Sequence, residues 1–189
     1  AFDLVLPAAL AGLTVALAPL KLGPAVYVPL AVALIVPMGP MIYRVAFAPM
    51  AQASVLVLLI ASFGVHFSLM GLGLVFFGPE GIGTQPLLAG DFSLGGIPVT
   101  GQSVVVVGTT VLLLVAFALF FERTLMGKAL RACSSNRLGA RLVGIPTTTA
   151  GSVAFALAAA MGAISGVLAG PIVTIYYDSG FLIGLKAFV

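Results

Sequence analysis

Charged residues are scarce in this chain. Among its 189 residues, Asp, Glu, Lys and Arg make up 7%, whereas hydrophobic residues make up 61% and the mean hydropathy is +1.27. A soluble domain needs about a quarter of its residues charged to keep its surface in water. The composition therefore excludes a soluble enzyme and indicates a protein whose surface is covered by lipid.

Groups that perform chemistry are scarce as well. The only cysteine is Cys133, which excludes an intrachain disulfide framework. The sequence has no Ser/His/Asp set, no carboxylate pair and no metal-ligand cluster. It also lacks a phosphate-binding P-loop, because residues 127–129 have neither the upstream glycine nor the hydroxyl residue of that motif. We expect no catalytic residue, cofactor or metal in this chain, and no ATPase site of its own.

Long apolar runs fill most of the sequence. A helix needs about 20 apolar residues to cross the ~30 Å hydrocarbon core of a bilayer. Five segments qualify, and a sixth begins near the end of the chain: 4–20, 22–43, 51–77, 103–121, 149–171 and 181–189. Open strands cannot span lipid, so the valine run within 103–121 is predicted to be helical. The expected fold is an all-α, polytopic transmembrane bundle formed by one domain, residues 1–189.

Two details of this bundle follow from its prolines and its ends. Segment 22–43 carries four prolines, each of which removes a backbone donor, so we expect a kinked span. The chain starts without a signal-peptide pattern and ends within an apolar run. We therefore expect an internal piece of a longer membrane protein, truncated at both ends.

Orientation follows from the positions of Lys and Arg. Five of the eight basic residues fall within 122–148, one within 44–50, and none within 78–102. By the positive-inside rule, 122–148 is a cytoplasmic loop and 78–102 an external loop. Because successive spans cross the membrane in opposite directions, 44–50 lies inside and 172–180 outside. Only Lys21 disagrees with this orientation, because it falls on the external side. Because the basic residues gather beside membrane spans, the net charge of +3 does not indicate nucleic-acid binding.

The basic loop, residues 122–148, combines charge with a helical pattern. One apolar face of a helix–turn–helix can hold Leu130, Leu138, Leu142 and Ile145, opposite the arginines. Gly144 suits a helix end, Pro146 stops continuation, and a threonine at 147–149 can cap the next span. A loop that only binds lipid headgroups needs the charge alone, whereas a docking element for a cytosolic partner needs this shape as well. The predicted docking residues are Leu130, Arg131, Ala132, Arg137, Leu138, Ala140, Arg141, Leu142, Gly144 and Ile145.

Segment 149–171 carries small residues at every fourth position. The row consists of Ala154, Ala158, Gly162, Gly166 and Gly170. Small residues let another helix approach closely, so this row is either a packing groove or the lining of a translocation path. Segment 103–121 has few small residues and is predicted to face lipid.

Three ionisable residues are weaker candidates for the substrate path. His66 lies in the middle of segment 51–77, where an ionisable side chain is a functional candidate by default. A neutral imidazole bonded to a neighbouring helix is the competing interpretation. Asp178 and Lys186 lie near the outer ends of the last spans, where they can meet a zwitterionic substrate, and Asp178 equally suits an interfacial turn.

The motifs of the basic loop and of the segments after it resemble a known family. Residues 127–132, Asn136-Arg137, Ala140 and residues 142–145 are similar to the cytoplasmic loop of branched-chain amino acid ABC transporter permeases. The similarity continues at 155–157, 160–163, 166–168, 180–181 and 184–188. It covers about residues 40–189. The sequence departs at Arg131-Ala132-Cys133, where the common importer loop has Glu-Ala-Ala.

The resemblance implies a multi-pass permease in the inner or plasma membrane of a bacterium or archaeon. Such a permease moves branched-chain or other hydrophobic amino acids inward. Its implied partners are cytosolic ABC ATPase subunits that use ATP and Mg, a second permease subunit, and a periplasmic or lipid-anchored substrate-binding protein, but no nucleic acid. Three alternatives stay open: a urea, amide or sugar permease of the same superfamily, an ion-coupled secondary transporter, and a scaffold or assembly factor with no transport role. The second usually places ionisable residues within the membrane, where this chain offers only His66.

Overall fold

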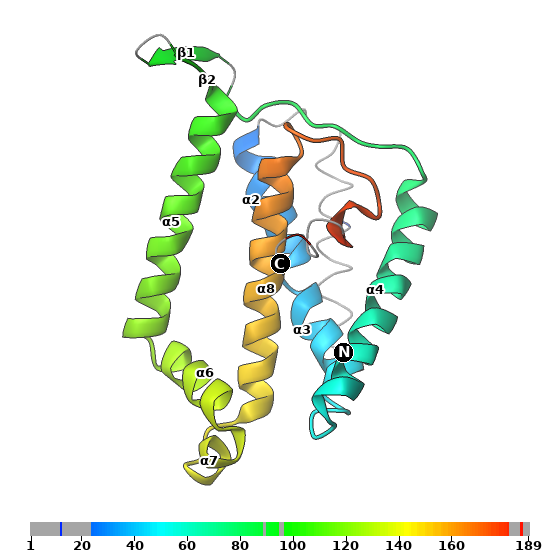
Figure 1. Ribbon diagram of the computed structural model, residues 1–189, viewed down its shortest axis with the longest axis vertical. Coiled ribbons are helices and arrows are strands. Elements are labelled where there is room, and N and C mark those ends of the chain that lie inside the picture. Colours follow the sequence, from blue (N-terminus) through cyan, green and yellow to red (C-terminus); the bar gives the residue numbers. More distant parts are fainter. Residues whose placement is uncertain (1–11, 13–23, 89, 95–96, 182–185, 187–189) are drawn as a thin grey trace.

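The computed structural model describes residue 12 and residues 24–88, 90–94, 97–181 and 186. It is a bundle of helices, with short segments at both ends (Figure 1). The helices are α2 (Pro24–Ile35), α3 (Met38–Ile42), the π-helix η2 (Tyr43–Phe47), α4 (Val55–Phe77), α5 (Gly101–Arg123), α6 (Leu125–Ser135), α7 (Arg137–Leu142) and α8 (Thr147–Ala169). An antiparallel hairpin of β1 (Asp91–Leu94) and β2 (Ile97–Thr100) precedes α5. The all-α, polytopic fold class is confirmed.

Four stretches of the described chain are long and apolar enough to cross a membrane. They are Val26–Phe47, Val55–Phe77, Gly101–Arg123 and Thr147–Ala169. Each corresponds to one predicted span, and the valine run is helical as expected. The predicted span 4–20 and nearly all of 181–189 lie outside the described residues.

The first described span is broken where its prolines predict. Helix α2 ends at Ile35 and α3 begins at Met38, directly after Pro37. The predicted end of this span at residue 43 is wrong, because η2 continues the helix to Phe47. In η2 the Ala48 N–H donates to the Tyr43 carbonyl oxygen, 2.7 Å away, so the backbone takes one extra residue per turn. Such π-helical turns occur often at functional sites.

Helix α8 occupies the centre of the bundle. It contacts α2, α3, η2, α5, α6 and α7 (Figure 1). It packs closely on α3, where a Cβ built on Gly39 would collide with the Phe155 carbonyl oxygen and lie 2.9 Å from the Ala159 Cβ. The rings of Tyr43 and Phe47 pack on Phe155 with centroids 5.3 and 4.9 Å apart. Small residues at the crossing therefore let large rings pack immediately beside it.

The connecting segments gather at two opposite ends of the bundle (Figure 1). At one end, the Arg137 guanidinium on α7 donates to the Ala51 carbonyl oxygen (2.6 Å), so the basic loop meets the turn after η2. At the other end, Ile82 and Ile175 form an antiparallel bridge, so the segment after α4 meets the segment after α8. This grouping is the one predicted for a chain whose successive spans cross the membrane in opposite directions. Which end faces the cytoplasm rests on the charge count alone and stays a prediction.

Candidate functional site

Two short helices, α6 and α7, are shaped by local sequence signals within the basic loop. The Thr124 hydroxyl accepts from the Gly127 N–H (3.0 Å) at the start of α6, and the Asn136 side-chain oxygen accepts from the Gly139 N–H (2.9 Å) at the start of α7. Both are side-chain N-caps. Gly127 also lies against the last turn of α5, where a Cβ would collide with the Phe120 carbonyl oxygen.

The end of α7 is a Schellman motif centred on Gly144. Its φ is +82°, the Ile145 N–H donates to the Ala140 carbonyl oxygen (2.9 Å), and the Gly144 N–H donates to that of Arg141 (3.0 Å). The predicted helix end at Gly144 is confirmed. The predicted threonine cap on the next span is wrong, because α8 begins at Thr147 with Pro146 at its N-cap position and no side-chain cap. The Thr147 hydroxyl accepts from the Arg141 Nε (3.0 Å) instead.

The three arginines predicted for docking also bind within the chain. Arg131 donates to the Phe121 carbonyl oxygen, Arg137 to that of Ala51 and Arg141 to the Thr147 hydroxyl. A guanidinium has five N–H donors, so these bonds use part of each group. They join α6 and α7 to the ends of the membrane helices, which makes the basic loop a fixed element of the fold.

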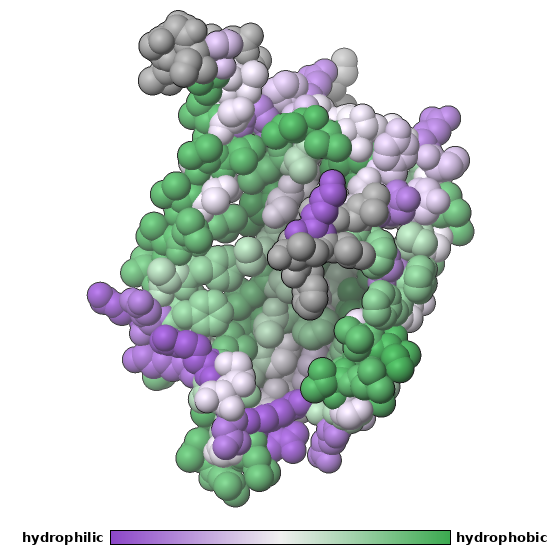
Figure 2. Space-filling view, viewed as in Figure 1, coloured by the Kyte–Doolittle hydropathy of each residue, from purple (hydrophilic) through white to green (hydrophobic). Residues whose placement is uncertain are grey.

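The predicted apolar face of the basic loop is split between the interior and the surface. Leu130 and Ile145 are half-buried, and Ala140 is buried. By contrast, Leu138, Leu142 and Val143 are 70%, 81% and 75% exposed. Figure 2 shows an apolar patch at the lower end of the molecule, where α7 lies, with hydrophilic residues above it. We call these three residues the α7 tip.

A second feature is an open, mostly apolar cavity of about 910 Å³ near the other end of the bundle. We call it the central cavity. Residues of α2, α3, α4 and α8 line it, together with residues 84–87 and Ile175. Its volume lies in the range of small-molecule binding sites. Polar side chains in its lining come from Tyr27, Thr84 and Gln85.

Among the described residues, the row of small residues on α8 makes a close contact only at Gly170, so a packing groove along the rest of the row stays a prediction. Ala154, Ala158, Gly162 and Gly166 are exposed. Among the described residues, no atom lies within 4 Å of a Cβ built on Gly162 or Gly166. Gly170 alone is enclosed, with the Thr84 hydroxyl 2.6 Å from its built Cβ.

The neighbouring row on α8 makes the close contact instead. Gly39 of α3 meets Phe155 and Ala159, and the Tyr43 ring occupies the space where a Gly151 Cβ would lie. Helix α8 has small residues on several faces, and the contact falls where the partner helix also has a glycine. The second predicted use, a pathway lining, stays a prediction for Gly162, Gly166 and Gly170, which border the central cavity.

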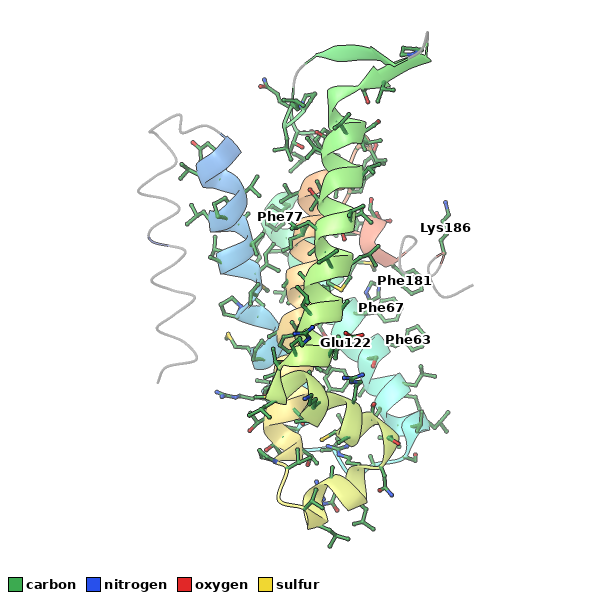
Figure 3. The ribbon with its side chains drawn as sticks, turned by 90° about the vertical axis from the view of Figure 1, so that its left-hand side faces the viewer. Phe63, Phe67, Phe77, Glu122, Phe181 and Lys186 are labelled. Atoms are coloured by element: carbon green, nitrogen blue, oxygen red, sulfur yellow. The ribbon has the colours of Figure 1, made fainter. Side chains whose placement is uncertain are left out.

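The three ionisable candidates lie apart from this cavity in the described structure. The His66 ring stacks on Phe181 at a centroid distance of 4.8 Å, so it contacts the segment after α8 through its face. Asp178 is exposed at a turn, where its carbonyl oxygen accepts from the Phe181 N–H (3.1 Å). Lys186 is exposed and points away from the helices, whereas Phe181 lies beside α4 (Figure 3).

Comparison with known proteins decides the family. The family described as branched-chain amino acid transport system, permease component, matches residues 4–189. The chain belongs to this family. The resemblance seen in the basic loop and the segments after it is thereby confirmed.

Curated relatives agree with the family. Over 156 residues the permease chain is 30% identical to the high-affinity branched-chain amino acid transport system permease protein LivH of Escherichia coli (strain K12) and to LivH of Salmonella typhimurium. It is 28% identical to the corresponding permease protein BraD of Pseudomonas aeruginosa. Each match covers 79% of this chain and 51% of the relative, so the chain spans about half the length of the curated relatives it matches. No solved structure matches it.

Proposed function

We propose that this chain is the membrane-spanning part of an ATP-driven importer that moves branched-chain or other hydrophobic amino acids inward. Support comes from the family, from the names of the relatives, and from four helices suited to span a bilayer. A separate cytosolic subunit hydrolyses ATP with Mg. A second permease subunit completes the pore, and a binding protein delivers substrate on the external side. Because the named relatives are bacterial, the membrane is the bacterial inner membrane.

The observation that carries this proposal is the α7 tip. A fully exposed leucine loses about 1.5–3 kcal/mol relative to a buried one. The tip nevertheless presents two leucines of α7 and the valine directly after them, and α7 is capped, ended by a Schellman motif and tied to the bundle. A segment that served only to set orientation would need neither the apolar residues nor the fixed shape. An apolar patch on the basic loop suits a groove on a partner, and the surrounding charges steer the encounter.

Contacts inside the chain provide a route from the α7 tip to the central cavity. Arg137 ties α7 to Ala51, in the turn directly after η2. The η2 rings Tyr43 and Phe47 pack on Phe155 of α8. Phe155 in turn touches Gly39, which lines the cavity. A force on α7 from closing ATPase subunits would therefore act on the α3–α8 crossing and bias the cavity between two arrangements.

The docking role is tested by changing the α7 tip without changing its charge. In the full-length protein, replacing Leu138 and Leu142 with Ser keeps every arginine and both helix caps. We expect the membrane insertion of this double variant to be normal and its binding to the purified ATPase subunit to fall at least tenfold, because the partner loses its apolar contacts.

A matched control is available on the same loop. Leu125 is as exposed as the α7 tip, but it lies at the start of α6 beside the end of α5. Leu125→Ser should leave ATPase binding within about twofold of wild type. Unchanged ATPase binding by the double variant would show that the basic loop only sets orientation.

A further inference from the structure

The segment after α4 crosses the bundle as a strap. Residues 81–88, which we call the strap, run from the end of α4 towards the start of α5 across the end of the molecule opposite α7 (Figure 1). Within the described residues the strap contains no helix or strand beyond its single bridge at Ile82. Its Thr84–Leu87 portion lines the central cavity, and Leu87 also lines a smaller cavity of about 450 Å³ between α2, α5 and α8. The strap therefore covers one side of both spaces.

Only a few backbone hydrogen bonds hold the first half of the strap in place. Ile82 and Ile175 exchange both of their N–H···O bonds, at 2.9 and 3.0 Å. The Thr84 N–H donates to the Gly170 carbonyl oxygen across 3.3 Å. Gly81 packs against Thr174 and Tyr176 so closely that a Cβ would lie 2.5 Å from the Thr174 methyl carbon. These contacts all go to the segment that follows α8.

One buried side chain holds the second half of the strap. Gln102, on the first turn of α5, is 5% exposed. Its amide oxygen accepts from the Leu87 N–H (3.0 Å), and its amide nitrogen donates to the Leu168 carbonyl oxygen near the end of α8 (3.0 Å). A single side chain thus joins the strap, α5 and α8. Since a buried amide that loses a partner is costly, Gln102 couples the position of the strap to that of α8.

We propose that the strap is the gate between the central cavity and the outer end of the bundle, and that Gln102 is the positioning residue that holds this gate shut. This inference rests on the proposed function, because a gate matters only if a small molecule passes through the cavity. The passing molecule is an uncharged or zwitterionic one with an apolar body. Among the described residues that line the cavity there is no Asp, Glu, Lys or Arg, and the polar side chains are those of Tyr27 and of Thr84 and Gln85 on the strap. A polar head group would meet the strap first, while an apolar body would lie along Gly162 and Gly166.

A reversible cross-link tests whether the strap must move. Residues that exchange both hydrogen bonds across an antiparallel bridge have Cα atoms about 5.5 Å apart, which fits a disulfide. In the full-length protein with Cys133→Ser, reconstituted with its partner subunits in proteoliposomes, Ile82→Cys and Ile175→Cys are introduced together and oxidised. We expect ATP-dependent uptake of radiolabelled leucine to fall at least tenfold on oxidation and to return on reduction.

A second cross-link on the same end serves as the control. Phe92 and Val99 are register partners in the β1–β2 hairpin, which projects from the start of α5 at the top of the molecule (Figure 1). A disulfide between cysteines at these positions should leave uptake within twofold. Uptake that persists with Ile82 and Ile175 cross-linked would show that the strap is not a gate. Failure of this pair to form a disulfide would contradict the position of the strap beside the segment after α8. If the Cys133→Ser parent shows no ATP-dependent uptake, the proposed function itself fails, which is a distinguishable result.

The role of Gln102 is tested by the accessibility of the strap. With a cysteine at Thr84 as the reporter, Gln102→Leu removes both amide bonds, and Gln102→Glu keeps an acceptor for the Leu87 N–H. We expect labelling by an impermeant maleimide to be fastest in Gln102→Leu, by about fivefold or more over the parent, and intermediate in Gln102→Glu. Ser103→Ala, which removes a hydrogen bond to Thr100 and none to the strap, should label like the parent. Equal labelling in Gln102→Leu and the parent would contradict the positioning role.

Discussion

Two glycines near the α3–α8 crossing have opposite surroundings, so the same substitution should affect them differently. At Gly39, a Cβ would collide with the Phe155 carbonyl oxygen, approach the Phe155 carbonyl carbon to 2.7 Å and lie 2.9 Å from the Ala159 Cβ. The first two atoms belong to the backbone of α8 and cannot move without shifting that helix. At Gly166, no described atom lies within 4 Å of the built Cβ. The same Gly→Ala change therefore meets opposite surroundings at these two positions.

The magnitudes follow from these contacts. Overpacking a close contact costs about 1–3 kcal/mol, so Gly39→Ala should lower the free energy of unfolding by that amount. Gly166→Ala adds no clash with a described atom. Both glycines lie within helices, so the preference of Ala over Gly, about 0.8–1 kcal/mol, favours both variants and cancels in their difference. The free energies of unfolding of the two variants should therefore differ by about 1–3 kcal/mol.

Unfolding in graded SDS, followed by helical circular dichroism, measures this difference. Equal stability of the Gly39→Ala and Gly166→Ala variants, or lower stability of Gly166→Ala, would refute the assignment of the close contact to the row containing Phe155 and Ala159.

Three further predictions concern orientation, a turn and a buried hydroxyl. In a Cys133→Ser background, an impermeant thiol reagent should label Ser135→Cys only from the cytoplasmic side and Ser93→Cys only from the external side; the reverse pattern would overturn the topology. Gly144→Ala, at φ +82°, should cost about 1–2 kcal/mol of unfolding free energy in the same SDS assay, because left-handed backbone is unfavourable for a residue with a Cβ. Tyr43→Phe should be neutral or stabilising by up to about 1 kcal/mol, since the Tyr43 hydroxyl is buried without a hydrogen-bond partner among the described residues; a clear loss of stability would show that this hydroxyl has a partner outside the described residues.

Features encoded locally were predictable from the sequence. The four described spans follow from the length of apolar runs, and the break in the first span follows from Pro37. The end of α7 follows from Gly144, because a left-handed residue is needed to close a Schellman motif. In each case the controlling signal lies within a few residues of the structure it produces.

Features that depend on a partner segment were not predictable. Several rows of small residues run along α8, and only the position of Gly39 on another helix selects the row that packs. A threonine at 147–149 was expected to cap α8, but the helix begins at Thr147, whose hydroxyl accepts a hydrogen bond from the Arg141 guanidinium. Gln102 gave no signal, since a glutamine near the start of a span is an ordinary interfacial residue until Leu87 and Leu168 are placed beside it.

The central claim, an ATP-driven permease, is tested most directly by the energy source of uptake. The full-length protein is reconstituted in proteoliposomes with its second permease subunit, its ATPase subunits and its binding protein, and uptake of radiolabelled leucine is measured with ATP present or absent and with ionophores added or omitted. For an ATP-driven permease we expect uptake that requires ATP and continues when ionophores have dissipated all ion gradients. Uptake that proceeds without ATP and stops when the ion gradients collapse would contradict it and would favour an ion-coupled transporter.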